Sequence, residues 1–504
     1  MSEKTHNITN SQDLSAYRSI FKATSLFGGV QLWKILIEIV KQKFIAILLG
    51  PTGMGISGLY TSATQLIQGL TSMGLSSSAV KNVAEANGSG DFQKISMVVT
   101  VLKRLVWFTG LLGMIVVIVL SPILSKSTFG SYDYTIPFMF LSVTLLFQQL
   151  SAGQSVILQG MRKLKHLAKS GVLASLFGLI ISVPIYYFFG IGGIVPTLIL
   201  NSITTLLFTW YFSRKIKIDK PIITPRQTFQ EGKGMLKMGL VMTLSSFLVL
   251  GSAYLLRIFI VRIGGAEEVG LYTAGFAIVN GYVGLIFTAM GTDYYPRLAG
   301  VNEDNRKCRD IINKQAEMVI LIIAPITMIF LLIAPNVIFL LYSNRFIPIT
   351  GFMQWAMLGM IFKAVSWSIS YLFIAKGEMK IYAINEFIFN IINLILTLFG
   401  YYYLGLDGLG IAFVISYFIY FIIVFCVAKN KFNFGLLSSS ITLCSIQLLF
   451  VASCFLLLYL WKSNFVYIPT VILTLMCCVY SLKELDKRID LFNIIKNFTD
   501  ERKN

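Results

Sequence analysis

Apolar runs of about 20 or more residues, separated by short polar segments, recur along almost the whole chain. Each run is long enough for one α-helix to cross the hydrocarbon of a bilayer. The alternation of apolar and polar residues that a transmembrane barrel needs is absent, so each span must satisfy its backbone as a helix. The pattern predicts an all-α polytopic membrane protein with about fourteen transmembrane helices. The expected spans are residues 20–49, 54–80, 96–124, 135–160, 166–189, 192–213, 237–263, 269–292, 312–341, 347–375, 381–404, 408–428, 436–461 and 464–482.

The chain repeats itself at a nearly constant offset. Residues 58–61 (Gly-Leu-Tyr-Thr) return as residues 270–273, which is an offset of 212. Residues 186–190 (Tyr-Tyr-Phe-Phe-Gly) match residues 401–405 (Tyr-Tyr-Tyr-Leu-Gly) at an offset of 215. An ordered series of such pairs predicts two pseudo-symmetric six-helix bundles. Repeated halves related by an axis along the membrane normal are a transporter architecture, with the substrate site between the halves.

The repeat divides the chain into four parts. We expect an N-terminal six-helix bundle over residues 1–213, a basic cytoplasmic linker over 214–236 and a C-terminal six-helix bundle over 237–430. Residues 431–504 lie outside the repeat. They are expected to form an extra helix pair followed by a basic cytoplasmic tail.

Basic residues set the expected orientation. The formal net charge is +19, and the excess of Lys and Arg follows the even-numbered spans and fills the C-terminal tail. By the positive-inside rule both termini are cytoplasmic. Because the basic excess lies at a membrane face, anionic membrane lipids are its expected partners and nucleic acid is not.

Motifs for enzymatic chemistry are missing from the sequence. Residues 53–58 match a dinucleotide-binding string, but they follow a spanning helix and not a strand, so a tight turn is the better interpretation. No Walker A string occurs, and the six cysteines lack the spacing of metal ligands. We therefore expect a non-enzymatic protein with no cofactor and no metal.

Four cations lie deep inside expected spans: Lys34, Lys43, Arg257 and Lys363. Lys34 precedes Pro51 by 17 residues, about 25 Å along a helix and hence near the bilayer centre. Each such charge costs about 2.5–3.5 kcal/mol on insertion scales, so contact with lipid is disfavoured. We interpret the four as the lining of a water-filled cavity. A surplus of positive charge there suits an anionic substrate, phosphate above all.

The sequence also allows structural roles for these charges. Lys34, Glu38 and Lys41 share one helix face and can neutralise one another, and Lys43 can extend outward to the head groups. Arg262, next to a glycine pair, is expected to reach the outer head groups.

Two tryptophans flank Lys363 along its span. Trp355 and Trp367 have two interpretations, stacking on sugar faces or facing lipid, and lipid contact is favoured.

Three stretches of sequence carry a resemblance to a known family. They are residues 49–55 (Leu-Gly-Pro-Thr-Gly-Met-Gly), residues 268–272 with 295–298, and residues 343–346 with 358–363 and 374–377. In these stretches the chain resembles the Wzx-type flippases of lipid-linked oligosaccharides, from the polysaccharide transporter family of the multidrug/oligosaccharidyl-lipid/polysaccharide exporter superfamily. The likeness covers about residues 17–430.

The resemblance implies a V-shaped pair of six-helix bundles that alternates between inward-open and outward-open states in the bacterial cytoplasmic (inner) membrane. The implied substrate is an undecaprenyl-pyrophosphate-linked oligosaccharide of the O-antigen type, moved from the inner to the outer leaflet. Polysaccharide polymerase and assembly proteins are implied partners. Family members also carry basic residues in spans one, seven and ten, where Lys34 and Lys43, Arg257 and Lys363 lie.

Other functions are weighed against this one. The extra helix pair resembles in position the last two helices of lipid II flippases, which makes a lipid II-type flippase an alternative. A multidrug or cation antiporter of the same superfamily needs an uncompensated carboxylate in its cavity, where this sequence places Lys and Arg. A membrane glycosyltransferase or polymerase needs outer acidic residues or a long outer loop, and the first outer loop is only residues 50–53.

Overall fold

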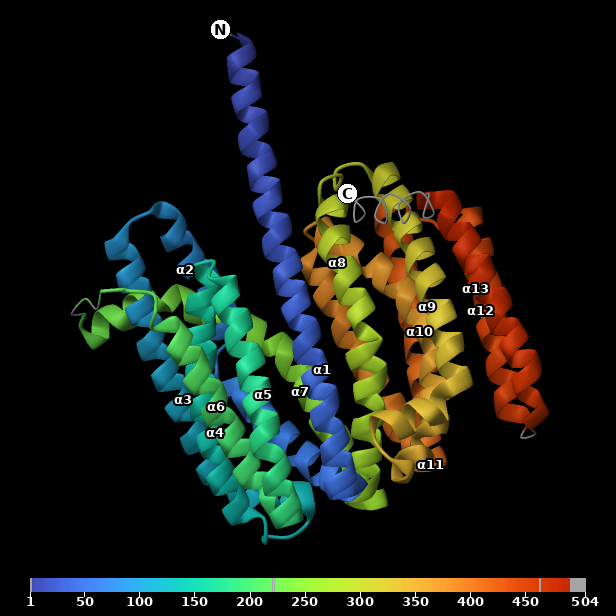
Figure 1. Ribbon diagram of the computed structural model, residues 1–504, viewed down its shortest axis with the longest axis horizontal. Helices are drawn as coiled ribbons and strands as arrows, with labels where there is room; N and C mark the ends of the chain where they lie inside the picture. Colours follow the sequence, from blue (N-terminus) through green and yellow to red (C-terminus); the bar gives the residue numbers. More distant parts are fainter. Residues whose placement is uncertain (1, 220, 222, 462–463, 490–504) are drawn as a thin grey trace, which may run out of the picture. The chain divides into compact units, whose positions relative to one another are not determined.

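The computed structural model describes residues 2–219, 221, 223–461 and 464–489, and most side chains from Trp33 onward except those at positions 241, 242, 244, 245, 282, 285, 289, 292, 464 and 489. Helices make up nearly all of these residues, and none of them lies in a strand (Figure 1). The predicted all-α class is therefore confirmed. The helices are α1 (Ser2–Thr71), α2 (Leu75–Ser89), α3 (Phe92–Phe129), α4 (Thr135–Gly160), α5 (Leu164–Phe189), α6 (Ile194–Ser213), α7 (Pro225–Phe276), α8 (Gly284–Ala299), α9 (Asn305–Leu341), α10 (Thr350–Ala375), α11 (Met379–Phe432), α12 (Ser438–Leu460) and α13 (Tyr467–Ile489).

Several pairs of expected spans run together as continuous helical stretches. Within the described part of the chain, nine helical stretches are long and apolar enough to cross a membrane. Three of them, Leu164–Ser213, Ser246–Thr288 and Met379–Phe432, each cover two spans expected from the sequence. The expected span 20–49 lies in α1, which bends at Gly50, and the span 54–80 begins in α1 and continues past its end at Thr71 into α2.

The described residues divide into two compact units, Met1–Val269 and Gly270–Asn504, called here the first and second unit. The first unit holds α1 to α6 and most of α7. The second holds the end of α7 and all later helices, including α12 and α13. The sequence placed the start of the second bundle at residue 237, whereas the helix up to Val269 packs with the first unit. The division by repeat therefore stays a prediction.

Two apolar clusters hold the first unit together. One joins α2, α3 and α4 through residues such as Leu75, Leu102 and Ile157. The other joins α1, α3, α4 and α7 and contains Tyr60 and Tyr254. The hydroxyl of Tyr254 lies 2.7 Å from Thr128 Oγ1, so a polar contact fixes α7 against the end of α3.

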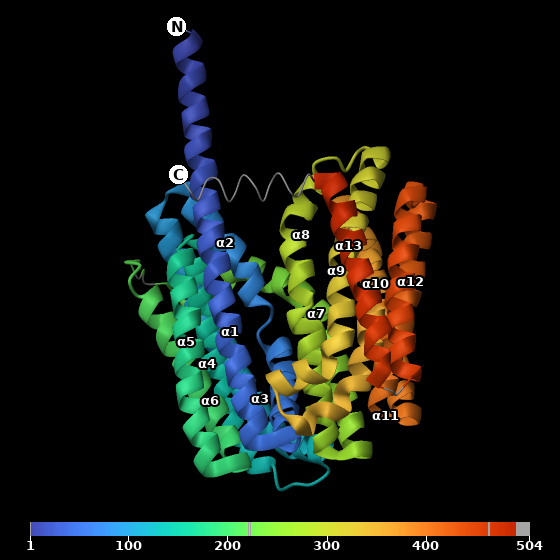
Figure 2. The ribbon, with the colours of Figure 1, turned by 45° about the vertical axis from the view of Figure 1, so that its right-hand side comes forward.

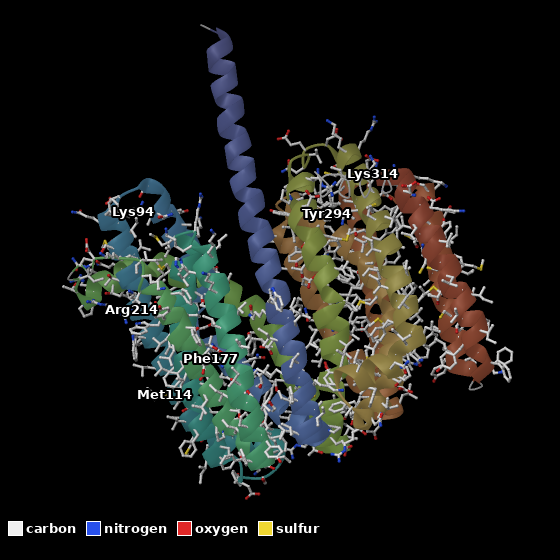
Figure 3. The ribbon with its side chains drawn as sticks, in the orientation of Figure 1. Lys94, Met114, Phe177, Arg214, Tyr294 and Lys314 are labelled. Atoms are coloured by element: carbon white, nitrogen blue, oxygen red, sulfur yellow. The ribbon has the colours of Figure 1, made fainter. Side chains whose placement is uncertain are left out.

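In the second unit, α10 packs against α9 and α11. Two buried tyrosines tie distant segments together: Tyr294 donates to the carbonyl of Ser368 at 2.6 Å and Tyr342 to that of Ala274 at 3.1 Å (Tyr294 is drawn in Figure 3). Each bond satisfies a hydroxyl that would otherwise be buried without a partner.

The last helix pair is attached to the second unit by a polar network. Glu317 of α9 accepts hydrogen bonds from Ser439 and Ser440 of α12 and pairs with Arg488 of α13, whose Nε lies 2.9 Å from Oε2. Figure 2 shows α12 and α13 beside α9, and the contacts agree. The pair is thus an integrated layer of the second unit.

The sequence repeat is also visible in the backbone. Gly190 has φ 54° and ψ −131°, and Gly405, its repeat counterpart, has φ 59° and ψ −140°. Residues with a side chain rarely adopt this region, so both halves use glycine to turn between consecutive spans.

A second repeated device caps helices. Asp91 precedes α3 and accepts from the amides of Gln93 and Lys94; Asp304 precedes α9 and accepts from those of Arg306 and Lys307. The two aspartates are 213 residues apart, the offset of the repeat. Hydrogen bonding to the Lys307 amide lowers the pKa of Asp304, which keeps the cap ionised.

Candidate functional site

Lys363 lies in the second unit, half-buried on α10, among residues that are almost all apolar. Its Nζ donates a hydrogen bond to Oδ1 of Asn280 at 2.8 Å. An amide oxygen accepts this bond without cancelling the charge. The hydrogen bond therefore leaves a charge on the lysine uncompensated at a depth where charges are expensive, which agrees with a functional role.

Three aromatic rings surround the same ammonium group. The centroids of Tyr417, Phe287 and Phe413 lie 5.3, 5.6 and 5.7 Å from Nζ. Faces of aromatic rings attract cations at such distances, typically by about 0.5–2 kcal/mol each. The rings and the amide together replace part of the hydration that Lys363 loses.

Asn280 is a site residue that the sequence analysis missed. It lies in a π-helical segment, Ala277–Tyr282, between α7 and α8. Such wide turns are rare and often occur at functional sites, because they redirect side chains that a regular helix would point elsewhere. The sequence did contain a signal for this residue, namely a polar amide side chain inside the apolar run 269–292.

An aromatic cavity of about 490 Å³ adjoins Lys363. It is lined by Phe287, Thr288, Gly291, Tyr295, Trp367, Tyr371 and Ile374. Trp367 lies one helical turn from Lys363, and its ring is 5.5 Å from Phe287 and 5.0 Å from Tyr371. The half-buried Trp367 side chain thus belongs to the wall of this cavity, and its expected contact with lipid stays a prediction.

Trp355, the other tryptophan of α10, has a structural role. Its ring lies 4.5 Å from Phe455 and 5.5 Å from Tyr459, both on α12. It helps to dock the last helix pair and does not line the aromatic cavity.

A carboxylate, Glu386, lies on α11 in the same unit and accepts a hydrogen bond from the hydroxyl of Tyr420. Phe389 connects this pair to the lysine site, since its ring lies 4.5 Å from Tyr420 and 5.0 Å from Tyr417. Aromatic residues thus separate the cation and the carboxylate.

The other three predicted cations lie in the first unit. Lys34 and Lys43 are half-buried on α1, and Arg257 is half-buried on α7, where its Nη1 donates to the carbonyl of Ala253 at 3.0 Å. Among the described side chains no ion pair joins Glu38 to Lys34 or Lys41, so mutual neutralisation is not seen. That the four cations form one site remains a prediction.

Arg262 has a partner inside the protein. Its Nη2 donates to the carbonyls of Lys126 and Ser127, at 2.9 Å for Ser127. These carbonyls end α3, where a cation complements the helix dipole.

Among the residues that the structure describes, no group of three or more His, Cys, Asp or Glu is placed to hold a metal ion.

Comparison with known proteins adds independent findings. The family model described as "Polysaccharide biosynthesis protein" matches residues 44–351, more than half of the chain. The Lipid III flippase of Escherichia coli (strain K12) is 24% identical over 376 residues, covering 73% of this chain and 88% of that protein. The Lipid III flippase of Shigella flexneri matches with the same identity and coverage.

Solved structures share the fold. The lipid II flippase MurJ in an inward closed conformation aligns over 93% of this chain and 99% of its own, with a TM-score of 0.70 and 13% identity. A multidrug resistance MATE family transporter of the MOP superfamily, inward-facing, aligns over 79% and 94%, with a TM-score of 0.67 and 18% identity. The chain is thus a multi-pass membrane protein with the fold of these transporters, as the resemblance implied.

Proposed function

We propose that this chain, which belongs to the polysaccharide biosynthesis protein family, is a flippase for a lipid-linked oligosaccharide. The observation that carries the proposal is a cation seated beside an aromatic cavity in the second unit: Lys363 on its amide partner Asn280, and Trp367 one turn away. Flippase relatives and the transporter fold support the same function.

The chemistry of the site matches such a substrate. A diphosphate needs positive charge to replace water during passage through the membrane interior, and the Lys363 ammonium supplies it. Sugar rings present apolar C–H faces, which pack on aromatic rings such as Trp367 and Tyr371. The ligand would be held by several weak contacts and not by a tight clamp. A tight site would oppose release, since a ligand bound equally well in both states shifts no equilibrium.

The specific substrate we propose is an undecaprenyl-pyrophosphate-linked repeat unit of the O-antigen type, moved from the inner to the outer leaflet of the bacterial cytoplasmic membrane. Alternating access of two six-helix bundles, residues 1–213 and 237–430, would move the head group. Lys34, Lys43 and Arg257 would act with Lys363 on the diphosphate. The basic linker 214–236 and both termini would face the cytoplasm.

A lipid II-type flippase is the second candidate. One observation favours it: the MurJ structure aligns over 93% of this chain, well past residue 430, where the repeat ends. Both candidates predict translocation of a polyprenyl diphosphate and no chemical conversion. They differ in the glycan.

The test is complementation of strains that lack either flippase. Without the O-antigen flippase, lipid-linked oligosaccharide accumulates on the inner leaflet, where mass spectrometry identifies its glycan. Wild-type protein should restore surface glycan, and Lys363→Glu should abolish restoration at matched protein level. Lys380→Glu, an exposed lysine at the start of α11, is the control and should behave as wild type. If the protein rescues only the strain that lacks the lipid II flippase, the second candidate is the correct one. Full restoration by Lys363→Glu would refute the site.

A further inference from the structure

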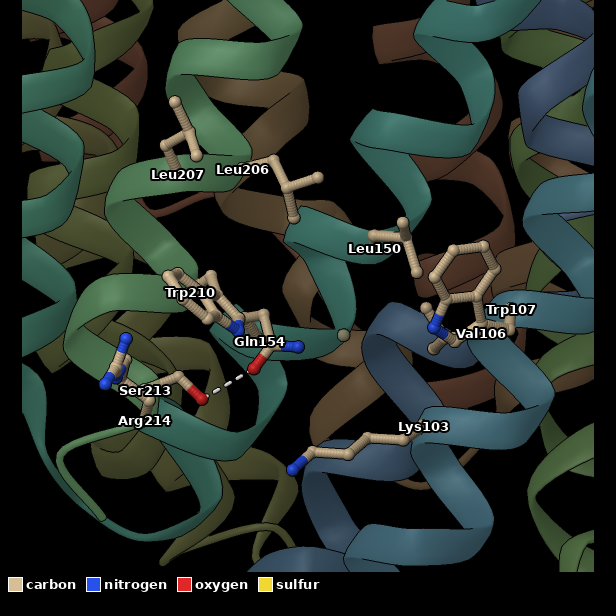
Figure 4. A pocket seen from close by; sticks show the side chains of 11 residues that line it. Lys103, Val106, Trp107, Leu150, Gln154, Leu206, Leu207, Trp210, Ser213 and Arg214 are labelled. Carbon is tan, nitrogen blue, oxygen red and sulfur yellow. Dashed lines mark hydrogen bonds between the residues drawn. The ribbon is translucent and has the colours of Figure 1, made fainter.

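A second cavity, of about 500 Å³, lies in the first unit between α3, α4 and α6 (Figure 4), and none of the four predicted cations lines it. It is lined by Lys103, Val106, Trp107, Leu150, Gly153, Gln154, Leu206, Leu207, Trp210, Ser213 and Arg214. None of the proposed transport chemistry uses it.

The polar residues of this cavity lie together at one end. Lys103 lies in the first third of α3, and Arg214 follows the end of α6, where its guanidinium lies 4.8 Å from the ring centroid of Trp210. Between them, Ser213 donates a hydrogen bond to Gln154 Oε1 at 2.6 Å. Figure 4 shows Lys103 extending from α3 toward this side of the cavity. Among the lining residues that the structure describes, none is Asp or Glu, so the end is cationic.

The rest of the cavity is apolar and faces outward. Trp107 on α3 is 51% exposed and Leu207 on α6 is 55% exposed, so both side chains lie on the apolar surface of helical stretches that are long enough to cross a membrane. Helical spacing places Trp107 one turn further from the charged end than Lys103, and Leu207 two turns further than Arg214. Polarity therefore changes along the membrane normal, from cationic at the end to apolar toward the bilayer centre.

A lipid has the same gradient of polarity. A phosphate matches the two cations, hydroxyls on a head group match the Gln154–Ser213 pair, and an acyl chain matches Leu206, Leu207 and Val106. The cavity is also lined by Trp107 and Trp210, and membrane proteins typically place tryptophan at the boundary between the lipid head groups and the acyl chains. Gly153 lets α4 come close to α3, since a Cβ there would lie 2.9 Å from Val106 Cγ2, and so helps to form the floor.

We infer that this cavity is a binding site for an anionic phospholipid, with the phosphate between Lys103 and Arg214. With the proposed orientation, the charged end faces the cytoplasmic leaflet. The site is separate from the proposed transport site, and the inference stands if the flippase assignment fails.

Native mass spectrometry of the full-length protein in detergent tests the inference, with phosphatidylglycerol and phosphatidylethanolamine added separately. Wild type should retain phosphatidylglycerol preferentially. Lys103→Gln with Arg214→Gln should reduce retention about thirtyfold, because two basic residues at roughly 1 kcal/mol each near an anionic lipid contribute about 2 kcal/mol, and about 1.4 kcal/mol is tenfold. The control, Lys94→Gln with Lys217→Gln, removes the same charge from two exposed lysines outside the cavity and should stay within twofold of wild type.

The charge-retaining pair Lys103→Arg with Arg214→Lys should keep retention near wild type, which separates loss of the site from loss of folding. Equal loss in the control pair would mean that surface charge alone attracts the lipid and would overturn the site. Displacement by millimolar inorganic phosphate, or tighter retention of a polyprenyl diphosphate, would replace the phospholipid with another ligand and refute the inference.

Discussion

Lys363 and Asn280 form a hydrogen bond of 2.8 Å between residues 83 positions apart, from α10 to the π-helical segment before α8. The described partners of the ammonium group are this amide and three aromatic rings. Because none of these groups is charged, the positive charge stays available to a ligand.

Substitution of Asn280, the neutral partner, therefore tests whether transport needs the available charge on Lys363. Asn280→Asp places a carboxylate against Lys363 and pairs its charge, so we expect transport to fall at least tenfold while the protein remains folded. Restored surface glycan at matched protein level is the measurement. Asn280→Gln keeps a neutral amide and should be affected less. If Asn280→Asp transports as wild type, the free charge on Lys363 does not serve transport.

The aromatic cavity predicts a requirement for a flat ring at position 367. Trp367→Leu should reduce transport several-fold, whereas Trp367→Phe should retain most of it, because the ring face packs on sugars. Trp355→Leu is the comparison, since Trp355 contacts α12 and should affect stability more than transport. Thermal unfolding in detergent and glycan restoration separate the two effects; identical profiles for Trp367→Leu and Trp355→Leu would argue against a ligand-contacting Trp367.

The attachment of the last helix pair depends on a buried ion pair. The Glu317 side chain is 9% exposed and that of Arg488 is 25% exposed. Arg488→Gln leaves the carboxylate without its cation and should lower stability by about 1–3 kcal/mol, below the value for a fully buried pair because water reaches the arginine. The double variant Glu317→Gln with Arg488→Gln should recover part of the loss. Thermal unfolding in detergent measures the stability of the single and double variants. If the losses of stability from the two substitutions simply add, the two side chains do not interact.

The two turn glycines should respond alike to substitution. Gly190→Ala and Gly405→Ala force a Cβ into a backbone region that glycine alone favours, at about 1–3 kcal/mol each. Gly192→Ala is the matched control, because its φ is ordinary and a Cβ there meets open space. Melting temperatures of the three variants check this, and a Gly192 variant as unstable as the other two would contradict it.

Orientation can be tested by labelling in a cysteine-free background. Asp133→Cys should react with a membrane-impermeant thiol reagent added outside, and Glu303→Cys should react only after permeabilisation. Both positions are exposed, so accessibility depends on the side of the membrane alone. The reverse pattern would overturn the cytoplasmic placement of the termini.

Much of this protein follows from its sequence alone, because a bilayer imposes a length and a polarity on every span. The apolar runs therefore predict the helices, and the offset of 212–215 pairs Gly190 with Gly405, which both adopt a positive φ in the structure. Lys363 was identifiable because a charge inside an apolar run has few explanations.

Tertiary structure decided which side chains meet. Asn280 as the partner of Lys363, Trp367 in a cavity wall, Arg262 at the end of α3, and Glu317 under the last helix pair all join segments far apart in the chain. A helix pattern says which face a residue occupies, but not which neighbour packs on that face. That choice depends on how helices fit against one another, and close packing of side chains determines it.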